Sequence, residues 1–340
     1  MRLAAVSLAA LLAVSAPALA GPKVVASVVP VHGIVAAVMG DTGTPELLLE
    51  GKLSEHRATF TADQISTLGK ADVVFIIGHG LEAKLAQISG SEAVNGKTFV
   101  ELSEAPGVKT LPIRAGGAWE AHDHDHDHGA EGEAAEAGHD HDKTAEAGHD
   151  HDHDHDKTAE DGHDHDGVLA FDPHVWLDPE NAKAMAAAVA AELSKADPAN
   201  AATYVANAKA FAASLDTVSA EIAQELEPAK GKPFIVFHDA YQYFESRFGL
   251  DAAGSISDVS AQAPSAERLK EVRDKLTATK AQCVFREPQY DDKVVAVVIE
   301  GSAAKSGVLD GLGADLPPGP DAYPQLLRNL AASFRACLAS

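Results

Sequence analysis

Hydrophobic residues in the first third of the chain gather in short runs, which are separated by stretches with helical spacing. Clusters of Val, Ile and Leu predict strands at 23–30, 46–51, 72–78 and 97–102. The apolar spacing between them predicts helices at 31–39 and 61–68. Strands that alternate with helices form parallel sheets covered on both faces, so this region predicts an α/β domain.

The last third of the chain repeats this alternation. Short apolar runs predict strands at 233–237, 283–285 and 307–309, and helical spacing predicts helices at 265–280, 291–304 and 323–338. The repetition predicts a second α/β domain over residues 231–340. The first domain would occupy residues 21–177.

Two linking helices are predicted between these domains, over residues 178–230. Asp178-Pro179 and Asp197-Pro198 each place an N-cap residue and a first-turn proline before an Ala-rich stretch. The second helix would run from Pro198 to about Glu227, which is roughly 45 Å at 1.5 Å per residue. The predicted fold class is therefore α/β, with two parallel-sheet domains joined by a long linking helix.

The first twenty residues have the pattern of a secretory signal peptide. Arg2 supplies a positive charge, residues 3–14 form a short apolar run, and Ala18-Leu19-Ala20 is a small-x-small cleavage site. The run is shorter than the about 20 apolar residues that span a bilayer. We therefore expect residues 1–20 to be removed and the mature chain to be exported to the periplasm.

Negative charge is concentrated in one segment, residues 119–167. This segment holds 18 acidic residues against two lysines, and so carries −16 of the total net charge of −24. The octapeptide Ala-Glu-Ala-Gly-His-Asp-His-Asp occurs at 135–142 and 145–152, and with one change at 159–166. Such a polar, like-charged segment buries too little apolar surface to order itself, so it predicts a disordered loop. The acidic balance disfavours nucleic acid and anionic membranes as partners.

The same segment holds 12 of the 17 histidines. They are His122, His124, His126, His128, His139, His141, His149, His151, His153, His155, His163 and His165. Ca²⁺ gains nothing from imidazole, whereas Zn²⁺, Ni²⁺ and Cu²⁺ bind it. The loop is therefore predicted to collect transition-metal ions, at low affinity because ordering a flexible chain costs entropy.

The chain contains two cysteines, Cys283 and Cys337. An isolated pair in an exported protein usually forms one disulfide, whereas two distant thiols outside a CxxC motif make a poor metal site. Cys283 lies in a predicted strand and Cys337 in the last predicted helix. The disulfide would therefore fix that helix to the second sheet.

Five histidines lie outside the loop, and the positions of three of them favour a shared site. His56 follows a predicted strand of the first domain, and His238 ends a predicted strand of the second. His174 lies between the loop and the linking helices. Because ligands bind beyond the carboxyl ends of strands in open α/β sheets, these three imidazoles are predicted to converge in a cleft between the domains.

Three imidazoles and one oxygen favour Zn²⁺, because Mn²⁺ and Mg²⁺ sites are richer in oxygen. The candidates for the oxygen are Glu55, Asp310 and a bound water. The two remaining histidines are interpreted differently. His32, near a helix start, would line the cleft or cap the helix, and His79, in a Gly-His-Gly turn, would lie on the surface.

The motifs around these residues resemble those of a known family. They are Ser54-Glu-His56, Pro173-His-Val-Trp-Leu177 after the His/Asp-rich loop, Val236-Phe-His-Asp-Ala-Tyr241, Cys283-Val-Phe-x-Glu-Pro-Gln289, Leu309-Asp-x-Leu-Gly313 and the late Cys337. From about Lys23 to the C-terminus, the chain is similar to the ZnuA family. Members of this family are the periplasmic zinc-binding components of bacterial ABC importers, within the cluster A-I metal-binding proteins.

The resemblance implies two α/β domains joined by one long helix, with zinc in the cleft between them. Carried over by motif, His56, His174 and His238 are the zinc ligands, and Glu55 or water completes the shell. Manganese-binding relatives tend to carry a carboxylate in place of His238, so the histidine indicates zinc. Asp310 matches a position that supplies a ligand in some other branches. The implied partner is an inner-membrane ABC permease.

The expected function is zinc capture and delivery by a monomer that is not an enzyme. A manganese or nickel importer of the same architecture is one alternative. A zinc-dependent hydrolase is another, because three histidines and an open position also describe catalytic zinc. However, the sequence has no HExxH motif. A surface adhesin is a third alternative, and the lack of a lipid-anchor cysteine after the signal peptide disfavours it.

Overall fold

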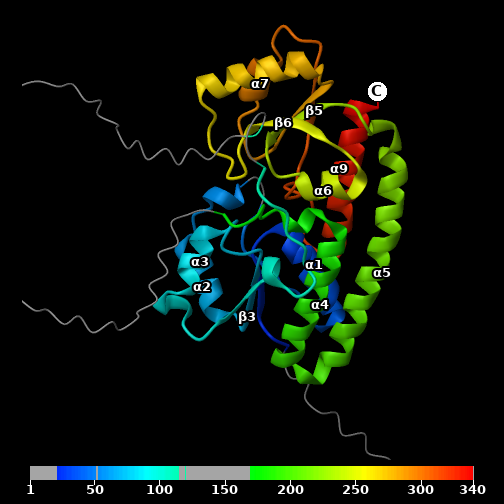
Figure 1. The fold of residues 1–340 in the computed structure, drawn as a ribbon. Helices are drawn as coiled ribbons and strands as arrows, with labels where there is room; N and C mark the ends of the chain where they lie inside the picture. The colour runs from blue at the N-terminus through cyan, green and yellow to red at the C-terminus, as the bar shows by residue number, and fades with distance from the viewer. Residues whose placement is uncertain (1–20, 51–52, 115–118, 120–168, 340) are drawn as a thin grey trace, which may run out of the picture. The chain divides into compact units, whose positions relative to one another are not determined.

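The computed structural model describes residues 21–50, 53–114, 119 and 169–339. These residues form two four-stranded parallel sheets with helices around them (Figure 1). The predicted signal peptide lies outside the described residues. So does the predicted loop at 119–167, except for Trp119, together with all its histidines.

The first sheet has the strand order β2-β1-β3-β4, and all its strand pairs are parallel. Its strands are β1 (Val24–Ala26), β2 (Glu46–Leu47), β3 (Val73–Ile76) and β4 (Thr98–Glu101). The helices beside this sheet are α1 (Val29–Met39), α2 (Ala62–Lys70) and α3 (Ala83–Ser89). The part of the chain before residue 179 is called the first half below, and the part after residue 226 the second half. The strand predicted at 23–30 ends early because Pro30 lies in the first turn of α1, where its fixed φ and missing N–H are tolerated.

The second sheet has the equivalent order β6-β5-β7-β8, again with parallel pairs. Its strands are β5 (Phe234–His238), β6 (Ala252–Ser257), β7 (Cys283–Arg286) and β8 (Lys305–Val308). The helices of this half are α6 (Gln242–Phe248), α7 (Ala266–Thr279), α8 (Lys293–Ile299) and α9 (Ala322–Leu338). The α8 helix ends earlier than predicted, just before Gly301, whose φ of 74° suits a glycine after a helix end.

Two long helices, α4 (Pro179–Ala196) and α5 (Ala201–Leu226), follow one another and lie side by side (Figure 1). The Asp178 side chain accepts a hydrogen bond from the N–H of Glu180 and so caps α4, as its sequence predicts. The α5 helix has 26 residues, which is about 39 Å at 1.5 Å per residue. It contacts α1 of the first half and α9 of the second, so the predicted long linking helix is confirmed.

One hydrophobic core includes residues of both halves. Its fully buried aromatic side chains include Phe75, Trp176, Tyr204, Phe234 and Phe334. The remaining turns are short 3-10 helices at Gly40–Thr42, Glu55–Arg57, Glu92–Val94, Leu102–Glu104, Val175–Leu177, Pro198–Asn200 and Glu227–Ala229. Across the described part of the chain, no helix has both the length and the apolar character needed to cross a membrane.

The predicted disulfide is present and joins Cys283 of β7 to Cys337 of α9, whose Cα atoms are 6.2 Å apart. It ties the last helix to the second sheet.

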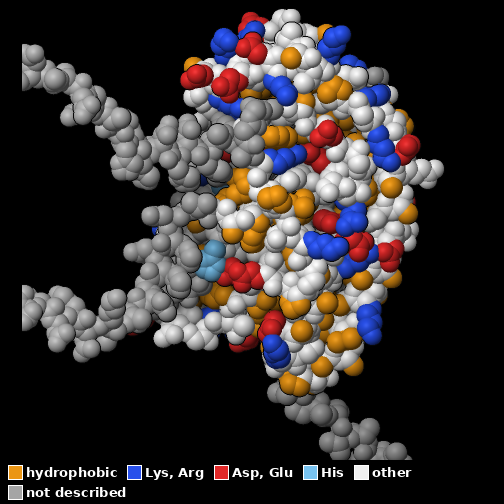
Figure 2. Space-filling view, in the orientation of Figure 1, with side chains coloured by type: hydrophobic (Ala, Val, Ile, Leu, Met, Phe, Trp, Pro, Cys, Tyr) orange, Lys and Arg blue, Asp and Glu red, His pale blue; other side chains and the backbone are white. Residues whose placement is uncertain are grey.

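Surface charge on the described residues is mixed in sign. On the face seen in Figure 2, Lys and Arg side chains lie among Asp and Glu side chains and hydrophobic ones.

Candidate metal centre

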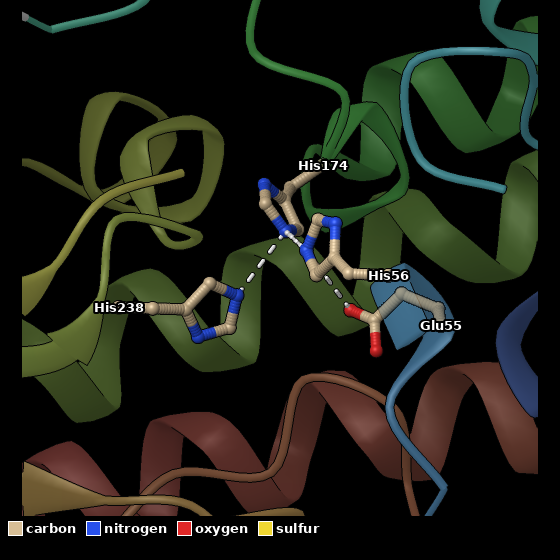
Figure 3. A group of neighbouring side chains, drawn as sticks. All are labelled: Glu55, His56, His174 and His238. Atoms are coloured by element: carbon tan, nitrogen blue, oxygen red, sulfur yellow. Dashed lines mark hydrogen bonds and ion pairs between the residues drawn. The ribbon is translucent and has the colours of Figure 1, made fainter. Parts of the chain in front are cut away.

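Four potential metal ligands, Glu55, His56, His174 and His238, lie close together (Figure 3). One ligand atom of each residue lies within 4.8 Å of the ligand atoms of the other three. Within the ranges that the structure describes, this is the only group of at least three His, Cys, Asp or Glu side chains with such spacing. The three histidines predicted to converge are therefore brought together, with Glu55 beside them.

Both halves of the molecule supply these side chains, and His238, Glu55 and His56 lie at or beyond the carboxyl ends of strands. His238 is the last residue of β5, which pairs with β6 and β7 in the middle of its sheet. Glu55 and His56 lie on the 3-10 turn that follows β2. His174 directly precedes the 3-10 turn that leads into α4. This placement matches the general position of ligands in open α/β sheets.

The imidazole Nε2 atoms face a common point. The Nε2 atom of His174 lies 3.3 Å from that of His56 and 3.3 Å from that of His238. The Oε1 atom of Glu55 lies 3.7 Å from the Nε2 atom of His56. All four side chains are nearly or fully buried. Three nitrogen lone pairs and one carboxylate oxygen can therefore approach a single ion.

Two buried carboxylates orient two of the imidazoles. The Oδ1 atom of Asp172 lies 2.8 Å from the Nδ1 atom of His174 and also accepts the backbone N–H of His174 at 3.0 Å. The Oε1 atom of Glu287 lies 2.8 Å from the Nδ1 atom of His238 and accepts its backbone N–H at 3.3 Å. An Nδ1–H that donates to a carboxylate leaves the Nε2 lone pair free for a metal.

Burial controls the protonation of the cluster. It lowers the pKa of His56 and of His174 well below 6.5, so both imidazoles are neutral at pH 7. Burial also acts to lower the pKa of His238, but the adjacent charge and hydrogen bond of Glu287 outweigh it, and the pKa is raised. Burial raises the pKa of Glu55 to about 7, against a lowering by the nearby His238. A bound cation would favour the ionised form of Glu55.

Tyr290 of the second half forms one wall of the site. Its ring stacks on that of Phe237, with centroids 4.7 Å apart, and its centroid lies 5.6 Å from that of His238. Its hydroxyl lies 3.1 Å from the Oγ atom of Ser54, and the guanidinium of Arg57 lies 5.5 Å from its ring centroid. Tyr290 thus contacts Ser54 and Arg57, the residues directly before and after Glu55 and His56.

The cavity beside the histidines is small. Its volume of 10 Å³ leaves room for about one water molecule. Its lining includes Glu55, His174, His238 and Tyr241. A space of this size suits a single ion rather than an extended substrate.

Asp310 lies outside the group of four, although it was a candidate for the oxygen ligand. Its carboxylate accepts hydrogen bonds from the backbone N–H groups of Gly313 at 2.9 Å and Ala314 at 2.7 Å, with longer bonds from Leu312 and Gln289. These bonds give it a role in holding the turn after β8.

Of the other two histidines, His32 does not cap α1, which has no side-chain cap, and it does not line the cavity beside the cluster, so its predicted role is wrong. His32 is buried in α1, with its Nε2 atom 3.0 Å from the carbonyl oxygen of Pro45. His79 has a side chain that is 66% exposed, with its Nδ1 atom 2.5 Å from Glu101, and it is a surface residue as predicted.

The sequence reasoning missed Asp172, Glu287 and Tyr290. Asp172 stands two residues before His174, so its proximity could have been a signal. Glu287 directly follows β7, the strand beside β5, and the strand-end argument that located His238 applies to it as well. Tyr290 carries no comparable signal in the sequence.

Comparisons with known proteins show relatives along almost the whole chain. A family model described as "ZnuA: Zinc-uptake complex component A periplasmic" matches residues 24–337. "High-affinity zinc uptake system protein ZnuA" of Brucella abortus is 44% identical over 333 residues, covering 94% of this chain and 93% of its own length. The protein of the same name from Paracoccus denitrificans is 37% identical over 318 residues, with 93% and 92% covered.

Solved structures share the fold. A crystal structure of ZnuA gives a TM-score of 0.69 at 23% identity, covering 94% of this chain and 99% of the other. The periplasmic zinc binding protein TroA from Treponema pallidum gives 0.70 at 20% identity, with 94% and 100% covered. At these identities the structures establish only the two-sheet fold. The family match over residues 24–337 and the 44% identity to a relative of nearly equal length go further, and they place this chain in the ZnuA family of periplasmic zinc-uptake components.

Proposed function

We propose that this protein captures zinc in the periplasm and delivers it to an ABC permease in the inner membrane. The observation that carries the proposal is the convergence of three imidazole nitrogens and the Glu55 carboxylate within 4.8 Å. The names of the relatives, which describe a high-affinity zinc uptake system, support the same function. The predicted signal peptide supports export.

The ligand set favours zinc among the divalent ions. Zn²⁺ prefers four ligands in tetrahedral N/O/S sites, whereas Mn²⁺ sites are usually richer in oxygen. The cluster offers three nitrogens to one carboxylate. Nickel also binds imidazole, so zinc and nickel are to be separated by metal competition.

His56, His174 and His238 are the proposed zinc ligands, and Glu55 is the proposed fourth. Asp310 is disfavoured as a ligand because four hydrogen bonds already occupy its carboxylate. A water molecule in the 10 Å³ cavity would be the alternative to Glu55. Substituting Glu55 by Gln tests which case holds, because losing a coordinating carboxylate should lower the zinc affinity more than losing a nearby carboxylate that acts only through space.

The segment at 119–167 is the proposed low-affinity collector. Its 12 histidines would hold zinc weakly and, through their tether, raise the local zinc concentration near the tight site. Deleting the segment should therefore remove weakly bound ions and leave the tight site intact. Loss of the tight site on deletion would mean that the segment supplies a ligand.

A binding protein without catalytic activity is the proposed class, acting as a monomer and without nucleic acid. The small cavity disfavours a hydrolase, because a peptide or ester would not fit beside the histidines. The proposed domains are residues 21–177 and 231–340, with linking helices over 178–230. A turnover assay with the zinc-loaded protein tests the class, and light scattering tests the monomer.

Calorimetric titration of the mature protein with zinc tests the proposal as a whole. We expect one tight site, which His238→Ala should abolish. The matched control is His79→Ala, which removes an exposed histidine away from the cluster and should leave the tight site unchanged. Retention of full affinity in His238→Ala would refute the assigned site.

A further inference from the structure

Arg114 joins the two halves of the molecule next to His238. It belongs to the chain of the first half that follows β4, whereas its partners Asp239 and Glu245 belong to the second. Its Nε atom donates to Asp239 at 2.9 and 3.2 Å, and its Nη2 atom makes a further contact with the same carboxylate. Its Nη1 atom donates to Glu245 at 2.7 Å.

This ion-pair cluster is largely shielded from solvent. Asp239 and Glu245 are each 3% exposed, and the Arg114 side chain is 16% exposed. The indole ring of Trp119 covers the guanidinium, with its centroid 3.6 Å from the guanidinium carbon. A shielded guanidinium that binds a carboxylate through two nitrogens fixes orientation as well as distance.

A second set of bonds connects the same two regions to His174. The Tyr243 hydroxyl, from α6, donates to the carbonyl oxygen of Asp172 at 2.7 Å and accepts the backbone N–H of Leu111 at 2.9 Å. The Asp172 carboxylate in turn orients His174. The chain that carries His174 and the chain that follows His238 are therefore bonded to each other on this side of the site.

We propose that Arg114 is a positioning residue for the zinc site, and that its ion pairs with Asp239 and Glu245 slow the release of zinc. The inference rests on the proposed function. A bound ion can leave only when its ligands separate, and His238 directly precedes Asp239. Holding Asp239 against the first half keeps His238 close to His174 and so opposes this separation.

The competing explanation is an ion pair that stabilises the fold without influencing the metal. Arg328 provides the matched control, because its Nε and Nη2 atoms donate to Glu221 at 3.2 and 2.9 Å. That pair joins α9 to α5 and contacts none of the four candidate ligands. It has the same ion-pair groups on the surface, where the side chains are 41% and 54% exposed and no effect on zinc release is expected.

The test is the rate of zinc dissociation into excess chelator, measured by stopped flow on the full mature chain. The double variant Arg114→Gln/Asp239→Asn removes one positive and one negative charge, so the net charge around the site is unchanged. We expect dissociation about tenfold faster, association within about twofold, and one tightly bound ion as before. Arg114→Lys keeps the charge but loses the planar fork, and should give a smaller acceleration.

The control double variant Arg328→Gln/Glu221→Gln should release zinc at the original rate. Unchanged dissociation in both Arg114→Lys and Arg114→Gln/Asp239→Asn would overturn the proposal. If the double variant does not fold, Arg114→Lys alone decides the matter.

Amide hydrogen exchange of the metal-free protein supplies a readout that does not depend on zinc. We expect faster exchange at residues 238–241 in Arg114→Lys, and equal exchange would count against a positioning role. If the unmodified protein binds no zinc, the proposed function fails, whereas the exchange result still tests whether Arg114 positions this segment.

Discussion

The two halves of the molecule present their histidines in different ways. His238 ends a buried strand, and a carboxylate of its own half, Glu287, lies 2.8 Å from its Nδ1 atom. His56 lies on a three-residue 3-10 turn, and no carboxylate of the described residues bonds to its Nδ1 atom. The comparison indicates that His238 of the second half is an oriented ligand, as is His174, whereas His56 of the first half is a more adjustable one.

This difference suggests an order of events in binding. His174 and His238 are both oriented by carboxylates and form the prepared part of the site. We expect the ion to contact these two histidines first and His56 afterwards. Substitutions of His56 and of His238 should then have unequal effects on the affinity for zinc and on its rates of binding and release.

The largest expected effect is that of His238→Ala. About 10–16 kcal/mol of zinc-binding free energy shared by four ligands gives about 3 kcal/mol for each, or roughly 100-fold in Kd. Removing His238 also leaves Glu287 buried without its partner, so we expect a loss of about 1,000-fold. Calorimetry or chelator competition measures it, with His79→Ala as the control.

His56→Ala should be less damaging, with a loss of about 100-fold in affinity, because a water molecule can replace its nitrogen and no carboxylate is hydrogen-bonded to its Nδ1 atom. The same competition measurement checks the prediction. An equal or larger loss than that of His238→Ala would contradict the proposed difference between the halves.

Glu287→Gln should weaken zinc binding by about tenfold, the lower end of the range for groups that orient metal ligands. The amide cannot provide the negative charge that stabilises the Nδ1–H of His238, although it keeps nearly the same size. Asp172→Asn is the parallel variant for His174. If neither changes the Kd, the carboxylates do not prepare the site.

The smallest expected effect concerns pH. A proton on the Nε2 atom of a ligand histidine competes with zinc for that atom. The pKa of His238 is raised, whereas the pKa values of His56 and His174 are lowered. Protons therefore compete with zinc at His238 at higher pH than at the other two histidines. Affinity should therefore fall as the pH drops towards and below 6.5. In Glu287→Gln the pKa of His238 should be lower, so the fall should begin at lower pH. Identical pH profiles for the unmodified protein and Glu287→Gln would argue against protonation of His238 as the cause of the fall.

The sequence predicted the candidate ligands better than it predicted the residues that orient them. His238 could be located because it follows a run of four apolar or aromatic positions, 234–237, and His174 because it follows the acidic segment. The role of Glu287 depends on the register that places Cys283 beside Phe234, which no local pattern reveals. The pairing of Arg114 with Asp239 likewise joins residues 125 positions apart.

The strands were predictable where runs of Val, Ile and Leu mark them, and less so where the strand residues are small or polar. The Val, Ile and Leu runs located seven of the eight strands found in the described residues. The missed strand, β6, consists of Ala-Ala-Gly-Ser-Ile-Ser, and its small residues lack the usual strand composition although most are buried. Tertiary pairing with β5, rather than intrinsic preference, makes this segment a strand.

The disulfide between Cys283 and Cys337 has a consequence for metal selectivity. These are the only cysteines of the chain, and the bond leaves the protein without a thiolate. Soft ions such as Cu(I) prefer sulfur, and the chain offers them no cysteine thiolate. The candidate ligands are imidazoles and a carboxylate, which mild oxidants do not alter. Metal binding by these ligands therefore requires no reduced thiol, whereas the disulfide that fixes α9 requires an oxidising environment to form.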